Sequence, residues 1–252
     1  METSKQTLKQ STIIWKYLKL SYLLDMLSTS SMTFLPIRNW RECDSYEDIF
    51  RDIRLIDTTK DIAYESSLLY DTLCGQSWTL GGDRECMWKV FSNLNNGIDD
   101  IAVLVKSTVG DMKQLIDYSF HQDGCTIHFN TSKIDNVTYL SEAEIKSWVA
   151  SIKTIKPEDV MEYAVKAAFL KRERRENGYD YTQEHEVRCV AWGDDEQDNR
   201  NNGIVFKNLS PSLFKEFILD PRLSDDVAQQ IREQLIDRGI DPGIIRKSSL
   251  QI

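Results

Sequence analysis

Three charged residues, Glu184, Glu186 and Arg188, alternate with less polar ones directly before an apolar run at 189–192. Successive side chains of a β-strand point to opposite faces, so this period of two predicts a strand that carries the three charges on one face. Val187 would then face the core, and Glu186 would face a cleft. Same-face neighbours lie about 7 Å apart, close enough for Arg188 to screen Glu186 and to leave Glu184 in a different environment. Such a row is either a functional site or an ordinary solvated strand face.

Strand and helix patterns alternate along the rest of the chain. Period-two runs of β-branched and aromatic residues predict strands, whereas apolar residues three or four apart predict helices. The segment 81–83 is expected to end one strand and to cap the helix after it. Strands are expected at 12–17, 32–35, 76–80, 101–105, 125–129, 134–140, 216–219 and 244–246. Helices are expected at 20–27, 45–56, 62–73, 87–91, 111–118 and 224–238, with two more before residue 184, the second opened by Pro157.

This mixed order, with strands dominating the middle of the chain, predicts an α+β fold with a mixed, largely antiparallel sheet and flanking helices. A chain of 252 residues with 41% hydrophobic residues can build a proper core. We expect an N-terminal tail at 1–11 and a single compact domain at 12–252. That domain would include a helical insertion near 44–75 and a C-terminal extension of one helix and one strand.

The charge balance excludes some classes of partner. The chain has 31 basic and 40 acidic residues and a net charge of −9. A general binder of duplex DNA or of anionic membranes needs a dominant positive field, which this balance does not provide. The sequence contains no uninterrupted run of 18 apolar residues and no recognisable signal peptide, so we expect no membrane association.

The cysteines and histidines predict neither disulfides nor a metal site. The five cysteines are odd in number and form no C-x-x-C pair. The three histidines are too scattered for a zinc motif. We therefore expect a protein of the reducing cytoplasm that holds no metal.

Four short motifs follow one another in a characteristic order. They are the segments 15–17 (Trp-Lys-Tyr), 77–79 (Ser-Trp-Thr), 87–88 (Met-Trp) and the Glu-x-Glu-x-Arg strand at 184–188. In this order and spacing they resemble the bacterial domain of unknown function family 2971, and the resemblance extends over roughly residues 13–250. One departure is Ser77, which stands where the family pattern has cysteine.

The same landmarks resemble, more distantly, the three-part plan of ADP-ribosyltransferases. That plan has a basic or aromatic residue on a first strand, a small hydroxyl residue on a second and a glutamate on a late strand. Lys16 or Tyr17, Ser77 and Glu186 would take these places. The resemblance implies NAD as co-substrate, because a carboxylate can stabilise the oxocarbenium character that develops on the ribose when nicotinamide leaves.

The resemblance also implies a division of roles among the site residues. Glu186, Ser77 and Tyr17 would be catalytic. An aromatic ring would stack on nicotinamide, and basic groups would hold the pyrophosphate. The implied NAD-binding residues are Lys16, Trp78, Trp88, Lys171, Arg172, Glu184 and Arg188.

A basic run at 171–175 precedes the charged row and is followed by Tyr179 and Tyr181. It could hold a pyrophosphate or a nucleic-acid backbone, with a tyrosine stacking on a base. Because Glu173 and Glu176 interleave with it, the run could equally be a solvated segment of mixed charge.

Two functions therefore remain open. The first is an NAD-using enzyme, similar to an ADP-ribosyltransferase, that acts on a macromolecular or nucleotide acceptor. The second is a non-catalytic module that binds or senses a nucleotide or a nucleic acid through the basic run at 171–175.

Overall fold

The computed structural model describes residues 8–40, 54–57, 62–65, 72–121, 129–152, 159–174, 178–193 and 203–251. Its internal contacts divide the chain into two compact units. Unit 1 comprises residues 1–5, 33–77 and 125–205, and unit 2 comprises residues 6–32, 78–124 and 206–252. We describe each unit by itself, and the single domain at 12–252 stays a prediction.

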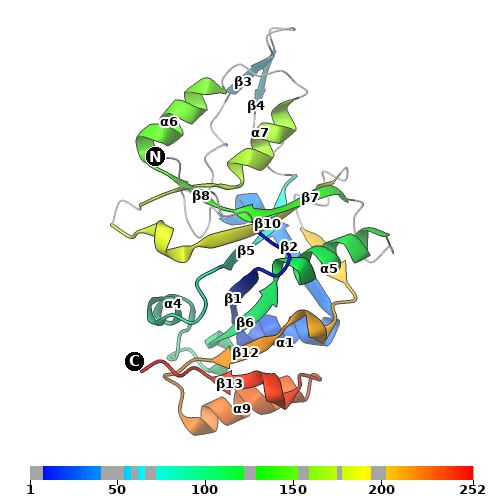
Figure 1. The fold of residues 1–252 in the computed structure, drawn as a ribbon, viewed down its shortest axis with the longest axis vertical. Helices are drawn as coiled ribbons and strands as arrows, with labels where there is room; N and C mark the ends of the chain where they lie inside the picture. Colours follow the sequence, from blue (N-terminus) through cyan, green and yellow to red (C-terminus); the bar gives the residue numbers. More distant parts are fainter. Residues whose placement is uncertain are drawn as a thin grey trace. The chain divides into compact units, whose positions relative to one another are not determined.

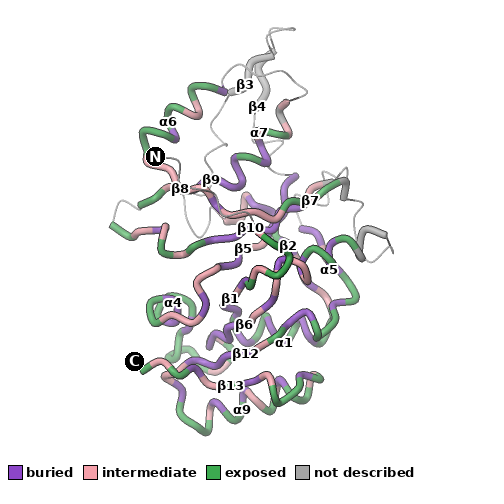
Figure 2. Tube along the Cα trace, in the orientation of Figure 1, coloured by how far each residue is buried: buried purple, intermediate pink, exposed green. Residues whose placement is uncertain are grey.

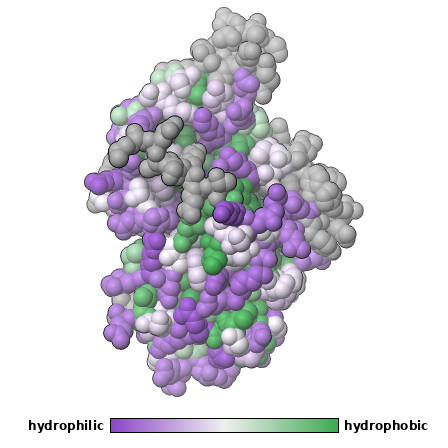
Figure 3. Space-filling model, in the orientation of Figure 1, coloured by the Kyte–Doolittle hydropathy of each residue, from purple (hydrophilic) through white to green (hydrophobic). Residues whose placement is uncertain are grey.

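The described residues form an α+β fold, as predicted (Figure 1). Nine strands belong to one mixed, mostly antiparallel sheet, and two further pairs of strands form small sheets of their own. No described helix is both long enough and apolar enough to cross a membrane. Hydrophilic side chains cover much of the face shown in Figure 3, with hydrophobic ones between them.

Unit 2 is built on the strands β1 (Ile13–Lys19), β6 (Ala102–Thr108), β12 (Glu216–Leu219) and β13 (Ile245–Lys247). β6 is antiparallel to both β1 and β12, whereas β12 and β13 are parallel. The last residues of β5 (Cys74–Thr79) pair with β1 through Trp15 and Thr79. The strands predicted at 12–17, 101–105, 216–219 and 244–246 are thus confirmed, with small differences at their ends.

The helices of unit 2 follow the predicted apolar spacing. The helix α1 (Leu20–Thr29) buries the four leucines that predicted it, and its C-cap residue Ser30 has a left-handed backbone. The helix α9 begins after Ser224, whose hydroxyl accepts a hydrogen bond from the amide of Val227. The α-helices of this unit are α1 (Leu20–Thr29), α4 (Glu85–Phe91), α5 (Val109–His121) and α9 (Asp225–Ile236), and its 3-10 helices are η2 (Ile98–Asp100), η5 (Pro211–Leu213) and η6 (Pro242–Ile244).

The helix α4 is not capped as predicted. Its N-cap residue is Arg84, which makes no side-chain capping bond, so the expected cap at 81–83 is wrong. The carboxylate of Asp83 instead accepts hydrogen bonds from the indole of Trp88 (2.7 Å) and the hydroxyl of Ser248 (2.7 Å). Trp88 packs edge-on against Tyr17 of β1, with 4.9 Å between the ring centroids.

In unit 1, β10 (Glu186–Gly193) pairs antiparallel with β7 (Phe129–Asn136) and also pairs with β5. β5 is antiparallel to β2 (Ser31–Pro36), which pairs with β11 (Ile204–Lys207). β8 (Thr138–Leu140) and β9 (Leu170–Arg172) form a separate parallel pair. The helices of this unit are α6 (Glu142–Ser151) and α7 (Val160–Ala167), with 3-10 turns η1 (Ile37–Asn39) and η4 (Tyr181–Glu184). α6 exposes most of its residues and buries Ile145 (Figure 2).

The predicted helical insertion near 44–75 is wrong in its described part. β3 (Arg54–Asp57) and β4 (Ile62–Glu65) form an antiparallel pair there. β-branched and aromatic residues favour strands. The single strand predicted at 134–140 is interrupted at Val137. Residues 134–136 form the end of β7, and residues 138–140 form β8. Pro157 and residues 125–128 of the strand predicted at 125–129 lie outside the described residues.

Candidate active site

The charged row does not begin on a strand, contrary to the prediction for Glu184. Glu184 is the last residue of the 3-10 turn η4, which begins where the carboxylate of Asp180 accepts a hydrogen bond from the amide of Thr182 (3.0 Å). His185 then takes a left-handed conformation with φ of 45°, and β10 starts at Glu186. This turn changes the direction of the chain, so Glu184 leaves the period-two pattern.

Glu186 and Arg188 share one face of β10, as predicted. Arg188 Nε donates to Glu186 Oε1 (2.7 Å) and its Nη2 donates to Oε2 (3.2 Å). Val187 between them is completely buried, so its predicted place in the core is confirmed. Glu186 is only 4% exposed, and its expected position facing a cleft stays a prediction. Its carboxylate is buried because the opposite charge on Arg188 is buried with it.

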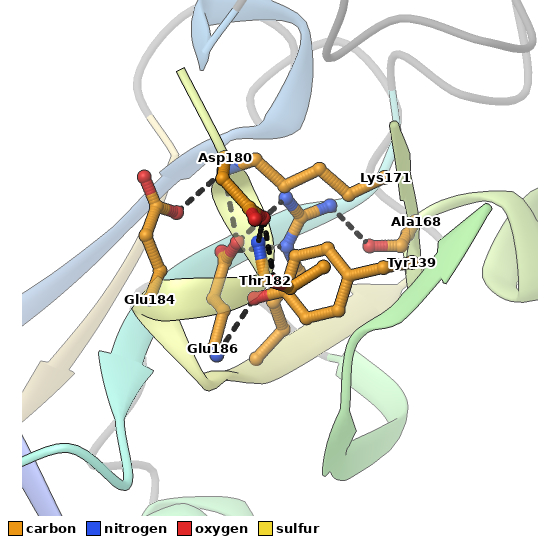
Figure 4. Close-up of polar contacts among 8 residues, drawn as sticks. Tyr139, Ala168, Lys171, Asp180, Thr182, Glu184 and Glu186 are labelled. Atoms are coloured by element: carbon orange, nitrogen blue, oxygen red, sulfur yellow. Dashed lines mark hydrogen bonds and ion pairs between the residues drawn. The ribbon is translucent and has the colours of Figure 1, made fainter. Parts of the chain in front are cut away.

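Lys171 of β9 joins the two carboxylates. Its Nζ lies 2.9 Å from Glu184 Oε2 and 3.1 Å from Glu186 Oε2, and it lies over the ring of Tyr181, 4.6 Å from the centroid. Figure 4 shows Lys171, Glu184 and Glu186 converging from β9, η4 and β10. The side chain of Glu184 is 19% exposed, the most accessible of the three. We call Lys171, Glu184, Glu186 and Arg188 the charge cluster; its two cations balance its two anions.

The neighbours of the cluster hold its parts in place. Arg188 Nη1 donates to the carbonyl of Ala168 (2.7 Å), and its guanidinium lies 4.7 Å from the ring centroid of Trp40. The amide of Glu186 donates to the hydroxyl of Tyr139 (2.9 Å; Figure 4). Gly75 makes room for Trp40, because a Cβ there would lie 3.3 Å from its ring and 2.9 Å from the backbone carbonyl oxygen of the β10 residue Cys189.

The surroundings of Glu186 keep it ionised. Burial alone would raise the pKa of this carboxyl. The charges of Arg188 and Lys171, with hydrogen bonds from Arg188 and from the hydroxyl of Ser77, outweigh burial and lower the pKa to about 2. Burial and the nearby carboxylate of Glu186 raise the pKa of the Tyr139 phenol. At neutral pH the site therefore holds a charged carboxylate beside a neutral phenol.

The structure brings five of the predicted residues together in unit 1: Ser77, Lys171, Glu184, Glu186 and Arg188. Arg172 is the last residue of β9 and is partly buried. The remaining ones, Lys16, Tyr17, Trp78 and Trp88, belong to unit 2. The catalytic and NAD-binding roles of all these residues stay predictions.

Within unit 2, Tyr17 has a structural environment of its own. Its hydroxyl donates to the carbonyl of Gly82 (2.9 Å) and accepts from the amide of Arg84 (3.1 Å). Burial raises the pKa of this phenol. Trp78 is 2% exposed, and Lys16 Nζ lies 5.8 Å from its ring centroid.

Three residues of the site were not predicted. Tyr139 belongs to a strand that was expected, but nothing in the sequence indicated its hydrogen bond to Glu186. Trp40 and Ala168 belong to no recognised motif, so their contacts with Arg188 were not predicted. Lys171 was expected in an exposed basic run, yet it is 7% exposed. The apolar segment 167–170 directly before it was the available signal, since a strand that follows buried residues carries alternate side chains inward.

No family model matches the sequence, and no curated protein is similar to it. The resemblance to family 2971 thus gains no support. Three solved structures of DarT from Thermus sp. 2.9 are similar to this chain. The complex with ADP-ribosylated ssDNA is 11% identical over 97% of both chains, with a TM-score of 0.41. The NAD+ complex is 10% identical over 96% of this chain and 98% of that one (TM-score 0.40), and the carba-NAD+ complex is 11% identical over 95% and 96% (TM-score 0.36). TM-scores of this size do not establish a shared fold or function.

Proposed function

We propose that this chain is an NAD-using enzyme that transfers ADP-ribose, with Glu186 as its central carboxylate. One observation carries the proposal. The hydroxyl of Ser77 donates a hydrogen bond to Glu186, although the two residues lie on strands far apart in the sequence. The ADP-ribosyltransferase plan requires a small hydroxyl residue and a late glutamate to meet in this way.

The electrostatics of Glu186 suit one role in this reaction. A carboxyl group with a pKa of about 2 is a weak base, so proton abstraction from an acceptor does not fit it. It remains negatively charged at neutral pH, and a fixed negative charge stabilises the oxocarbenium character of the ribose as nicotinamide leaves. A ribose hydroxyl could also donate to Glu186 in place of the Ser77 hydroxyl, because the two donors are chemically alike.

The other cluster residues have supporting roles in this proposal. Arg188, completely buried, fixes the orientation of Glu186 through two hydrogen bonds. Lys171 would offer its ammonium to a pyrophosphate oxygen, and Glu184, the more exposed carboxylate, would receive the acceptor. The catalytic role of Tyr17 follows from the resemblance alone. The NAD-binding roles of Lys16, Trp78, Trp88 and Arg172 follow from the same resemblance.

A second candidate function is a non-catalytic module that binds a nucleotide or a nucleic acid. It is favoured because both carboxylate oxygens of Glu186 already accept hydrogen bonds from the charged groups of Lys171 and Arg188. Such a balanced and buried set of charges can also serve stability and specificity alone. In that case a ligand would bind without being consumed.

The experiment that separates the two functions uses NAD and single-stranded DNA as probes. We would measure the melting temperature with millimolar NAD and then the release of nicotinamide, with and without an oligonucleotide or a cell lysate as source of acceptors. The enzyme proposal expects nicotinamide release that stops in Glu186→Gln. Binding of either probe without release would support the second function, and absence of both responses would contradict both.

A further inference from the structure

A cavity of about 430 Å³ lies in unit 1 among β7, β8, α6 and the segment before β9. This volume falls in the range of small-molecule sites. The residues Thr138 and Leu140 of β8 line it, whereas Tyr139 between them contacts Glu186. Because strand side chains alternate between faces, the cavity and the charge cluster lie on opposite sides of β8. The cavity is therefore a separate site.

The cavity has an apolar wall suited to a flat ring. Trp148 of α6 and Phe169 lie among its lining residues, together with Leu140 and Leu170. Phe169 is 4% exposed, and Lys133 Nζ lies 4.9 Å from its ring centroid, whereas Trp148 is only partly buried and is the ring that a ligand could contact. Aromatic ligands stack well on such rings, which contribute large contact areas and preferred geometries.

The charges around the cavity leave one cation available. Lys133 and Asp135 form an ion pair with each other (3.2 Å). The carboxylate of Glu144 accepts hydrogen bonds from the amide (2.8 Å) and the hydroxyl of Ser141 in a capping box. Lys166 also lines the cavity and makes no ion pair with any described residue. An anionic group would find its partner there.

We propose that this cavity binds a nucleoside monophosphate, with the base against the partly exposed ring of Trp148 and the phosphate at Lys166. The hydroxyls of Thr138 and Ser147, which also line the cavity, match the hydroxyls of the sugar. A volume of this size suits a single nucleotide rather than a strand of nucleic acid. The proposal is independent of the NAD chemistry proposed for Glu186.

Isothermal titration of the full chain with AMP, GMP, CMP and UMP tests this proposal, with adenosine and inorganic phosphate as partial ligands. We expect at least one nucleotide to bind more tightly than either partial ligand. Lys166→Ala should weaken binding about 10-fold, the usual effect of losing a charged hydrogen bond. Ser147→Trp, at an exposed position of α6, should abolish binding by filling the cavity.

Lys146→Ala is the matched control. Lys146 lies beside Ser147 on α6, pairs with Glu142 (2.7 Å) and has a side chain that is 75% exposed. Its loss should leave nucleotide affinity unchanged. The proposal is overturned if no nucleotide binds at millimolar concentration, or if adenosine or phosphate binds as tightly as the nucleotide. An equal loss in Lys146→Ala and Lys166→Ala, or unchanged binding in Ser147→Trp, would overturn it as well.

Discussion

The hydroxyl of Ser77 on β5 donates a hydrogen bond to the carboxylate of Glu186 on β10. This bond places a small neutral donor beside a carboxylate that otherwise faces Arg188 and Lys171. Of the contacts to Glu186, it is the one that a substrate hydroxyl can replace without removing a charge. The stability of the site therefore depends on the pairing of Glu186 with Arg188 and Lys171, whereas the proposed chemistry depends on its contact with Ser77.

Glu186→Gln should destabilise the protein strongly. The substitution leaves Arg188 and Lys171 buried with only Glu184 to balance them, and breaking a buried ion pair in this way costs about 3–5 kcal/mol. Glu184→Gln should cost only about 1 kcal/mol, since the side chain of Glu184 is 19% exposed and water can partly replace its interaction with Lys171. Unfolding in urea measures both; equal losses would mean that the cluster does not stabilise the fold as its geometry indicates.

Val187→Asp should prevent stable folding at neutral pH. Val187 is completely buried beside the charge cluster, and an aspartate there would be a buried charge without a partner. Val187→Ala is the control, because it removes volume without adding charge and should cost about 1–3 kcal/mol. Circular dichroism of the two variants compares them. A folded Val187→Asp protein with a normal melting temperature would show that the register of β10 is wrong.

Acid should weaken the protein through Glu186. The pKa of this carboxyl falls from 4.5 to about 2 on folding, so its stabilising effect is complete above pH 4.5 and is lost as the pH falls towards 2. A shift of this size corresponds to roughly 3 kcal/mol. Urea unfolding between these pH values should show a steeper decline for the natural chain than for Glu186→Gln. Parallel curves would assign the acid sensitivity to other carboxylates.

Ser77→Ala should barely change stability but should slow the proposed reaction. One neutral hydrogen bond contributes about 1 kcal/mol, which corresponds to roughly 5-fold in rate if the hydroxyl acts in the transition state. Ser77→Thr, which keeps the hydroxyl, should retain more activity than Ser77→Ala. Rates of nicotinamide release and melting temperatures of both variants check this. A large loss of stability in Ser77→Ala would indicate a structural role for the hydroxyl.

Local patterns predicted the elements of unit 2 well because one apolar face determines each of them. The leucines of α1 are buried as their spacing requires, and β1 buries its apolar residues Ile14, Tyr17 and Leu18. The region near 44–75 was predicted wrongly because its isoleucines fit a helical spacing as well as a strand. The β-branched side chains of Ile56 and Ile62 favoured the strands β3 and β4, which pair with each other.

The candidate site was predictable only in part, for a physical reason. The shared face of Glu186 and Arg188 follows from their spacing of two residues on one strand. The left-handed conformation of His185 could not be predicted, because such a conformation is usually indicated by a glycine and here the residue is a histidine. Lys171 is buried because it pairs with the carboxylates of Glu184 on η4 and Glu186 on β10. A run of basic residues in the sequence does not show which of them will form such tertiary ion pairs.

The central claim is that Glu186 stabilises the departure of nicotinamide from NAD, and nicotinamide release tests it most directly. The assay would use NAD labelled in its nicotinamide ring, lysate as source of acceptor, and a temperature at which every variant is folded. Glu216→Gln is the control, since Glu216 also pairs with two cations, Lys106 and Arg246, but lies on β12 of unit 2. We predict a loss of at least about 100-fold in Glu186→Gln and none in Glu216→Gln. If the natural chain releases no nicotinamide, or if Glu186→Gln releases it at the natural rate, the claim is wrong.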